Sequence, residues 1–222
     1  MSAADPSDTV ADGGDVLHSG AAGGRVVRGG AIRVAGFGIG VLFGLGTSAL
    51  LLRHLGVVDY GKYGTIAALL GLVLALSDGG LTTIGARELA TTEAGPRRVA
   101  TASTLMFLRL VTTTLGVVIA IVFAAIAYAT AELTLGAALV GASVVLISMQ
   151  AMATVPLLVS LRIAPMTGFE VLRHALSFVG VLVLVLAGAG LTWFFTLQIP
   201  IAAILLLLTV IYVRRSFPIG VH

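Results

Sequence analysis

Two charged side chains, Asp78 and Arg109, fall inside long apolar runs of this sequence. A carboxylate or a guanidinium inside a membrane helix is costly, so such groups usually pair, face water or line an ion or substrate path. Counting about 1.5 Å per residue from the nearest arginines, Arg87 and Arg98, places both groups roughly 13 to 17 Å into their helices. The matching depth predicts an Asp78–Arg109 pair. The alternatives are a carboxylate that only fixes helix packing and an arginine whose head group reaches the interface.

Two more polar residues are candidates for contact with a substrate. Gln150 falls near the middle of a later apolar run, and Arg33 lies close to the face of a glycine-rich helix, because seven residues return nearly to the same angle at Gly40. We therefore predict four substrate-binding residues: Arg33, Asp78, Arg109 and Gln150.

Glu170, Arg173 and His174 form a separate charged cluster near the expected start of another apolar helix. At spacings of three and four residues the carboxylate can reach both neighbours. The cluster is either a salt-bridged turn at the membrane interface or a contact for an anionic lipid head group. The four histidines are scattered and cysteine is absent, so the sequence predicts no metal site, no cofactor and no enzyme active site.

The composition is that of a membrane protein. Apolar residues make up 58% of the chain and charged residues 10%, whereas a soluble domain of 222 residues needs far more polar surface. The net charge of +3 is small, and no dense basic patch with aromatic residues is present, so nucleic-acid binding is excluded.

A helix needs roughly 20 apolar residues to cross hydrocarbon. On this rule the sequence predicts an all-α fold, an integral membrane bundle of six transmembrane helices. The expected spans are residues 31–52, 60–81, 103–128, 133–158, 169–188 and 192–213. We expect residues 1–27 to be a disordered cytoplasmic tail, 28–215 to be the six-helix lobe and 216–222 to be a short cytoplasmic tail.

The distribution of basic residues orients these helices in the plasma membrane, because Lys and Arg are enriched on the cytoplasmic side. With both termini in the cytoplasm, the outer turns contain only Arg53 and Lys62. Ten arginines then lie in the inner segments: Arg25, Arg28, Arg33, Arg87, Arg97, Arg98, Arg162, Arg173, Arg214 and Arg215.

Small residues recur every four positions in the first span, at Gly36, Gly40, Gly44 and Ser48. Such a ridge allows close approach of another helix, either as ordinary packing or as a wall that slides during transport. Pro156 interrupts the fourth span and predicts a kink there.

Several of these segments resemble one protein family in fixed order. They are residues 51–56 (LLRHLG), 60–64 (YGKYG), 77–81 (SDGGL) and 86–90 (ARELA). The pattern is similar to the start of a polysaccharide-biosynthesis flippase, a translocase of O-antigen and other lipid-linked oligosaccharides in the multidrug, oligosaccharidyl-lipid and polysaccharide exporter superfamily. Residues 162–212 also resemble the fifth and sixth helices of that family.

The resemblance implies a transporter that turns undecaprenyl-pyrophosphate-linked oligosaccharide repeat units from the inner to the outer leaflet. Family members usually have two six-helix lobes, whereas this chain supplies the N-terminal one only. The implied partners are therefore membrane lipids, the lipid-linked oligosaccharide and a second lobe, either another copy of this chain or a companion chain.

Two other functions remain open on the sequence. The first is a non-transporting remnant or scaffold that binds other membrane proteins through the ridge at Gly36. The second is half of a cation-coupled drug exporter whose activity depends on Asp78.

Overall fold

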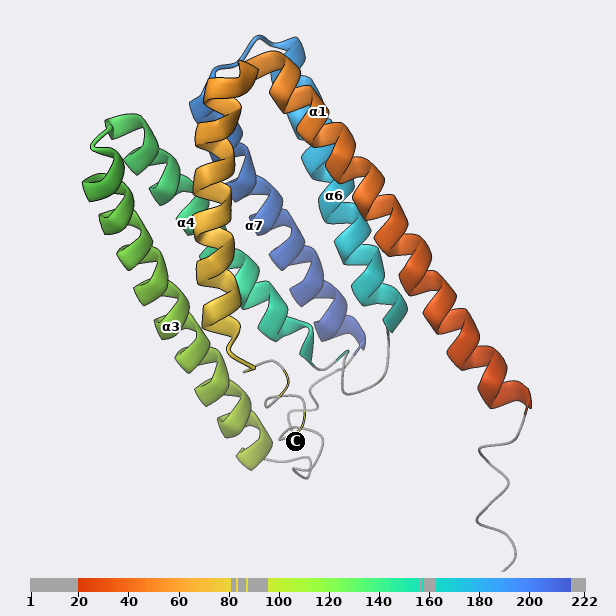
Figure 1. Cartoon of the computed structure of the whole chain (residues 1–222). Helices are drawn as coiled ribbons and strands as arrows, with labels where there is room; N and C mark the ends of the chain where they lie inside the picture. Colours follow the sequence, from red (N-terminus) through yellow and green to blue (C-terminus); the bar gives the residue numbers. More distant parts are fainter. Residues whose placement is uncertain are drawn as a thin grey trace, which may run out of the picture.

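The computed structural model describes residues 20–80, 83, 87, 96–155, 157 and 163–216. This part of the chain is all-helical and contains five long helices (Figure 1). They are α1 (Gly20–Asp78), α3 (Pro96–Tyr128), α4 (Ala131–Ala153), α6 (Ile163–Leu186) and α7 (Leu191–Ser216). Each is long and apolar enough to cross a membrane, which confirms the all-α class and is compatible with a multi-pass membrane protein.

Helix α1 is bent at a single residue, Gly56. Its backbone angles there are φ 74° and ψ 176°, a region that residues with a β-carbon avoid, while the residues on both sides stay helical. Residues 20–55 form the first arm of α1 and residues 57–78 the second arm. The described residues thus form five long helices, the first of them bent, where the sequence predicted six separate ones. The predicted polar turn is helical except at Gly56.

The bend of α1 and the α3–α4 and α6–α7 connections lie at one end of the bundle, the turn end (Figure 1). The start of α1 and the end of α7 lie at the opposite end, the terminal end, and the two arms of α1 diverge towards it. Two cross-contacts join the turns: the Lys62 ammonium lies 3.2 Å from the Glu132 carboxylate, and a ring nitrogen of His54 lies 2.9 Å from the carbonyl oxygen of Ala189.

In the described part of the chain, two apolar clusters form the core and meet at α7. The larger one joins the second arm of α1 to α3, α4 and α7. The smaller one, Leu51, Val181 and Phe194, joins the first arm to α6 and α7. Tyr63 packs against both clusters and stacks on Phe195 with the ring centres 5.5 Å apart. The two arms of α1 are therefore held to one common framework through α7.

The glycine ridge is used inside the chain, but only in part. A β-carbon at Gly36 would overlap the methyl group of Thr167, and one at Gly40 would lie 2.9 Å from the imidazole of His174, so α1 and α6 approach closely there. Gly44 has open space around it and Ser48 is exposed. Each four-residue step turns the helix about 40° further, and this drift carries the later positions off the contact face.

Three helix boundaries differ from the approximate ones expected from the sequence. Helix α1 begins at Gly20, inside the segment expected to be a disordered tail; residues 1–19 lie outside the described residues. Helix α4 ends at Ala153 instead of reaching residue 158, and the expected kink at Pro156 falls on a residue that is not described. Helix α6 begins at Ile163, six residues earlier than expected. Its first turn contains Pro165, which has no backbone N–H group; this is tolerated there because the N–H groups of a first turn have no partner inside the helix.

Candidate functional site

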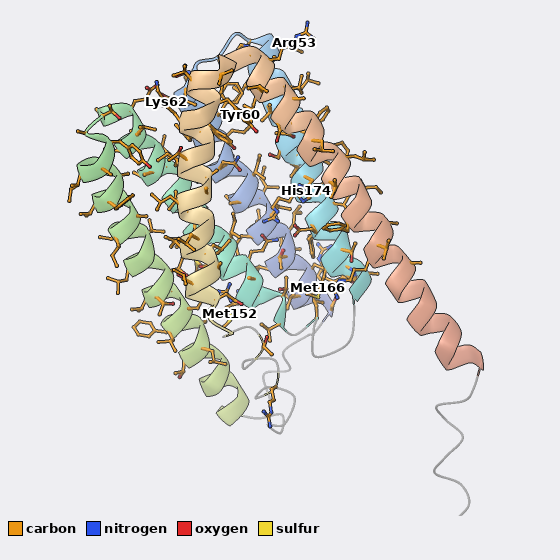
Figure 2. All side chains as sticks on the ribbon, viewed as in Figure 1. Arg53, Tyr60, Lys62, Met152, Met166 and His174 are labelled. Atoms are coloured by element: carbon orange, nitrogen blue, oxygen red, sulfur yellow. The ribbon has the colours of Figure 1, made fainter. Side chains whose placement is uncertain are left out.

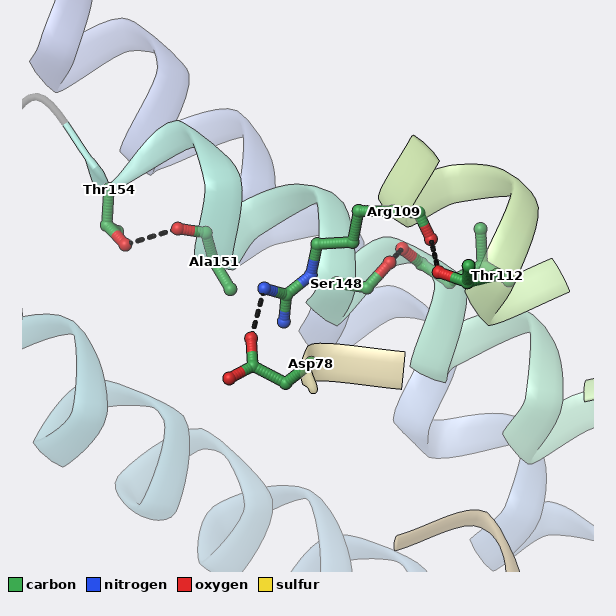
Figure 3. A network of polar contacts seen from close by, with 7 residues as sticks. Asp78, Arg109, Thr112, Ser148, Ala151 and Thr154 are labelled. Atoms are coloured by element: carbon green, nitrogen blue, oxygen red, sulfur yellow. Dashed lines mark hydrogen bonds and ion pairs between the residues drawn. The ribbon is translucent and has the colours of Figure 1, made fainter. Parts of the chain in front are cut away.

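The Arg109 guanidinium donates a hydrogen bond to the Asp78 carboxylate (Figure 3). This confirms the predicted pairing of the two residues across α1 and α3. Asp78 is the last residue of α1, because Gly79 and Gly80 follow with positive φ angles of 40° and 84°. The expectation that Asp78 lies well inside its helix was therefore wrong.

Two effects favour a cation beside Asp78. A carboxylate at the C-terminus of a helix is disfavoured by the partial negative charge of the last carbonyl groups. Arg109 offsets both the carboxylate and this helix end. The burial of the pair is uneven, since the Arg109 side chain is 4% exposed and the Asp78 side chain 38%. In Figure 3 the guanidinium lies between Asp78 and α4, on the side of Ser148 and Ala151.

Gln150 links α4 to α7. Its amide donates a hydrogen bond of 3.2 Å to the hydroxyl of Thr209, which is fully buried. Arg33 is exposed on the first arm of α1. The four predicted substrate-binding residues thus lie in three settings: the Asp78–Arg109 pair, the Gln150–Thr209 link and the surface of the first arm. Their role towards a substrate stays a prediction.

The charged cluster on α6 is placed differently from the expectation. Glu170 forms the predicted ion pair with Arg173, and its carboxylate lies 3.5 Å from Nε2 of His174. Because α6 begins at Ile163, however, His174 lies three helical turns from the start of the helix. Figure 2 shows His174 between the level of Arg53 at the turn end and that of Met166 near the terminal end.

A pocket of about 190 Å³ lies beside this cluster, between α4, α6 and α7. Its polar lining is Arg173, His174, Ser177 and Gln198, and its apolar lining is Ile147, Ile201 and Ala202. The Gln198 amide also donates a hydrogen bond of 2.9 Å to the Tyr63 hydroxyl on the second arm of α1. His174, another lining residue, packs against Gly40 on the first arm of α1. Through these two residues the pocket is linked to both arms.

Sequence reasoning missed Ser177 and Gln198. Gln198 had a local signal, since an uncharged amide two residues before Pro200 interrupts an otherwise apolar helix. Ser177 had almost none, because a single hydroxyl in a membrane helix usually bonds to its own backbone. Thr113, one turn beyond Arg109, was also missed; its hydroxyl is buried without a hydrogen-bond partner.

A larger groove of about 570 Å³ is lined by residues of the second arm of α1 and of α3. Its polar lining residues are Ser77, which directly precedes Asp78, and Thr112, which is three residues after Arg109. The rest of the lining is apolar. Among the described residues, no group of three or more His, Cys, Asp or Glu side chains could hold a metal ion. No protein-family model, curated protein or solved structure matches this chain.

Proposed function

We propose that this chain is one lobe of a membrane transporter that flips lipid-linked oligosaccharides, with undecaprenyl pyrophosphate as the lipid carrier. The observation that carries the proposal is the ion pair between the buried Arg109 and the half-open Asp78 in an apolar helix bundle. Ionisable groups in such a setting mark ion or substrate paths more often than they add stability. The sequence resemblance to polysaccharide-biosynthesis flippases supplies the class of substrate.

In this proposal both arms of α1 cross the plasma membrane, which makes six crossings in total. The apolar part of α1, Arg33–Asp78, would be about 69 Å long if straight, more than twice the roughly 30 Å of hydrocarbon. The bend at Gly56 divides α1 into two arms, so that each arm can cross the hydrocarbon once. The terminal end carries Arg214 and Arg215 and faces the cytoplasm, and so do both termini.

The substrate cavity of this proposal opens towards the cytoplasm at the terminal end, where α1 ends with Asp78. Arg33, Asp78, Arg109 and Gln150 are our candidates for contact with the substrate there. The apolar groove beside Asp78 offers a path for a hydrocarbon chain. One lobe gives only one wall of such a cavity, so a second copy or a companion chain completes it.

Two observations weigh against the other functions. The ridge at Gly36 and Gly40 is covered by Thr167 and His174 of the same chain, so it is not free to bind another membrane protein. The Asp78 carboxylate is neutralised by Arg109, which disfavours a role as a cation site in a drug exporter.

Proteoliposomes containing a fluorescent undecaprenyl-pyrophosphate oligosaccharide test the proposal. The chain should expose the lipid to an external glycosidase faster than empty liposomes do, and the double variant Asp78→Asn/Arg109→Gln should be slower than the unmodified protein. Arg53→Gln, which changes an exposed arginine at the turn end, is the matched control. Dye efflux that depends on Asp78, without lipid flipping, would refute the proposal.

A further inference from the structure

The charged cluster on α6 lies near the middle of its helix. Arg173 and His174 are roughly 15 to 17 Å from Ile163, within an apolar span of 23 residues. Ionisable groups at such a depth are costly and are retained where they bind something or pair with each other. The ion pair between Glu170 and Arg173 accounts for the presence of these two charges. It does not account for the polar residues Ser177 and Gln198, which line the neighbouring pocket.

These side chains share one property at the pocket between α4, α6 and α7: all can donate hydrogen bonds. Arg173 has five N–H groups in a planar fork, Ser177 has a hydroxyl, Gln198 has an amide and His174 has an imidazole. None of the described residues lining the pocket is a carboxylate. A cationic fork surrounded by neutral donors suits an oxyanion, and arginine in particular suits phosphate.

Glu170 holds the cluster in place from outside the pocket. Its side chain is 55% exposed, and it contacts both Arg173 and His174 from the preceding turn of α6. The ion pair uses the Nη2 atom of Arg173, and the guanidinium has other N–H groups for a second partner. His174 is fixed from the other side by its close contact with Gly40.

The size of the pocket limits what it can hold. Pockets for drug-sized ligands measure roughly 300 to 1,000 Å³, and this one has about 190 Å³. It can accommodate a compact group of a few heavy atoms, such as a phosphate, but not an oligosaccharide. Arg109 is a poorer candidate for the same role, because it is buried and already paired with Asp78.

We propose that the pocket lined by Arg173, His174, Ser177 and Gln198 binds the phosphate group of an anionic ligand. The identification of that ligand as a lipid pyrophosphate rests on the proposed function, whereas the anion site itself does not. The hydrogen bond from Gln198 to Tyr63 and the contact of His174 with Gly40 place this site against both arms of α1.

Isothermal titration of the purified full chain in detergent tests the site with three probes: farnesyl pyrophosphate, farnesol and inorganic pyrophosphate. We expect farnesyl pyrophosphate to bind and farnesol to bind much more weakly. Arg173→Gln should weaken binding about tenfold to a hundredfold, the value of a charge-assisted hydrogen bond, and Gln198→Leu about tenfold or less. Arg53→Gln, which changes an exposed arginine at the turn end, should leave the affinity unchanged.

Equal affinity of Arg173→Gln and the unmodified chain would overturn the proposal, and so would equal affinity for farnesol. If Arg173→Gln does not fold, Arg173→Lys and Gln198→Leu carry the test, because the lysine keeps the charge and loses the fork. Inorganic pyrophosphate that binds as tightly as the farnesyl form would keep the anion site and overturn the lipid assignment. A chain that binds the probe but flips no lipid, either alone or with a companion chain, would retain this site and lose the proposed function.

Discussion

Arg109 and Asp78 form an ion pair in which the cation is 4% exposed and the anion 38%. The asymmetry means that the two partners do not depend on each other equally. Breaking a pair by removing one partner is costly because a charge is left in a medium that solvates it poorly. The half-exposed carboxylate has water or lipid head groups as a substitute, whereas the buried guanidinium has much less access to either.

We therefore expect Asp78→Asn to destabilise the chain by about 3 kcal/mol, the lower end of the range for buried pairs, and Arg109→Gln by less. The double variant Asp78→Asn/Arg109→Gln should regain most of the loss. Thermal unfolding of the detergent-solubilised proteins measures all three. If the losses of the two single variants simply add in the double variant, the residues are not coupled.

The bend of α1 gives a second prediction. Gly56→Ala should destabilise the fold by roughly 1 to 3 kcal/mol, because the φ of 74° with an extended ψ is strained for any residue with a β-carbon. Gly61→Ala is the matched control, since Gly61 is helical and has open space around it. Both variants can be compared by their midpoint of unfolding in detergent. An unfolding midpoint unchanged in Gly56→Ala would contradict the role of the bend.

A third prediction concerns the close packing of α1 and α6. Gly36→Ala should cost about 1 to 3 kcal/mol, because the added methyl group overlaps Thr167 and forces the helices apart. Gly44→Ala meets no neighbour and should be neutral or slightly stabilising. Equal unfolding midpoints for the two variants would show that the ridge does not set the helix spacing.

The membrane orientation can be tested by cysteine labelling, since the natural chain contains no cysteine. Val58→Cys and Gly190→Cys, both exposed at the turn end, should react with a membrane-impermeant maleimide added to intact cells. Thr83→Cys, an exposed position just beyond α1, should react only in inverted vesicles. The reverse labelling pattern would place the turn end in the cytoplasm, which would contradict the proposed topology and the proposed direction of transport.

The last prediction is that a lone copy does not flip lipid, because one lobe leaves the second wall of the cavity open. Chemical cross-linking in membranes should capture a dimer of this chain or a complex with a companion chain. Light scattering in mild detergent gives the mass of the purified assembly. A monomer by this measure that still flips lipid-linked oligosaccharide would contradict the need for a second lobe.

The sequence predicted the long helices because their apolar runs are long. It also predicted the Asp78–Arg109 pair, although the depth count behind that prediction assumed a helix that continues beyond Asp78, where α1 in fact ends. Two other predictions were wrong, each for its own physical reason. The charged residues 53–59 suggested a turn, yet a single glycine bends α1 while its neighbours remain helical. The early start of α6 places His174 near the middle of the helix and not near its first residue, because a proline in a first turn favours a helix start.

The pocket could not be predicted from the sequence. Its polar residues come from α6 and α7, and only packing brings Ser177 and Gln198 to the same cavity. Periodicity shows which residues share a face of one helix, but not which faces of two helices meet. The hydrogen bond between Gln198 and Tyr63 joins residues 135 positions apart, beyond the reach of any local pattern.

The bend at Gly56 also bears on how the chain is made. In the proposed topology the two arms enter the bilayer as one helical hairpin, and the residues around the bend must pass through the hydrocarbon to the far side. Arg53, Asp59 and Lys62 make that passage costly. The Lys62 ammonium lies 2.8 Å from the Asp59 carboxylate, one helical turn away. This pair can therefore cross the bilayer as a neutral unit, and Arg53 is the one charge of the three that it does not neutralise. Biosynthetic insertion, more than the stability of the finished bundle, is then the step at which an added charge near Gly56 would do the greatest harm.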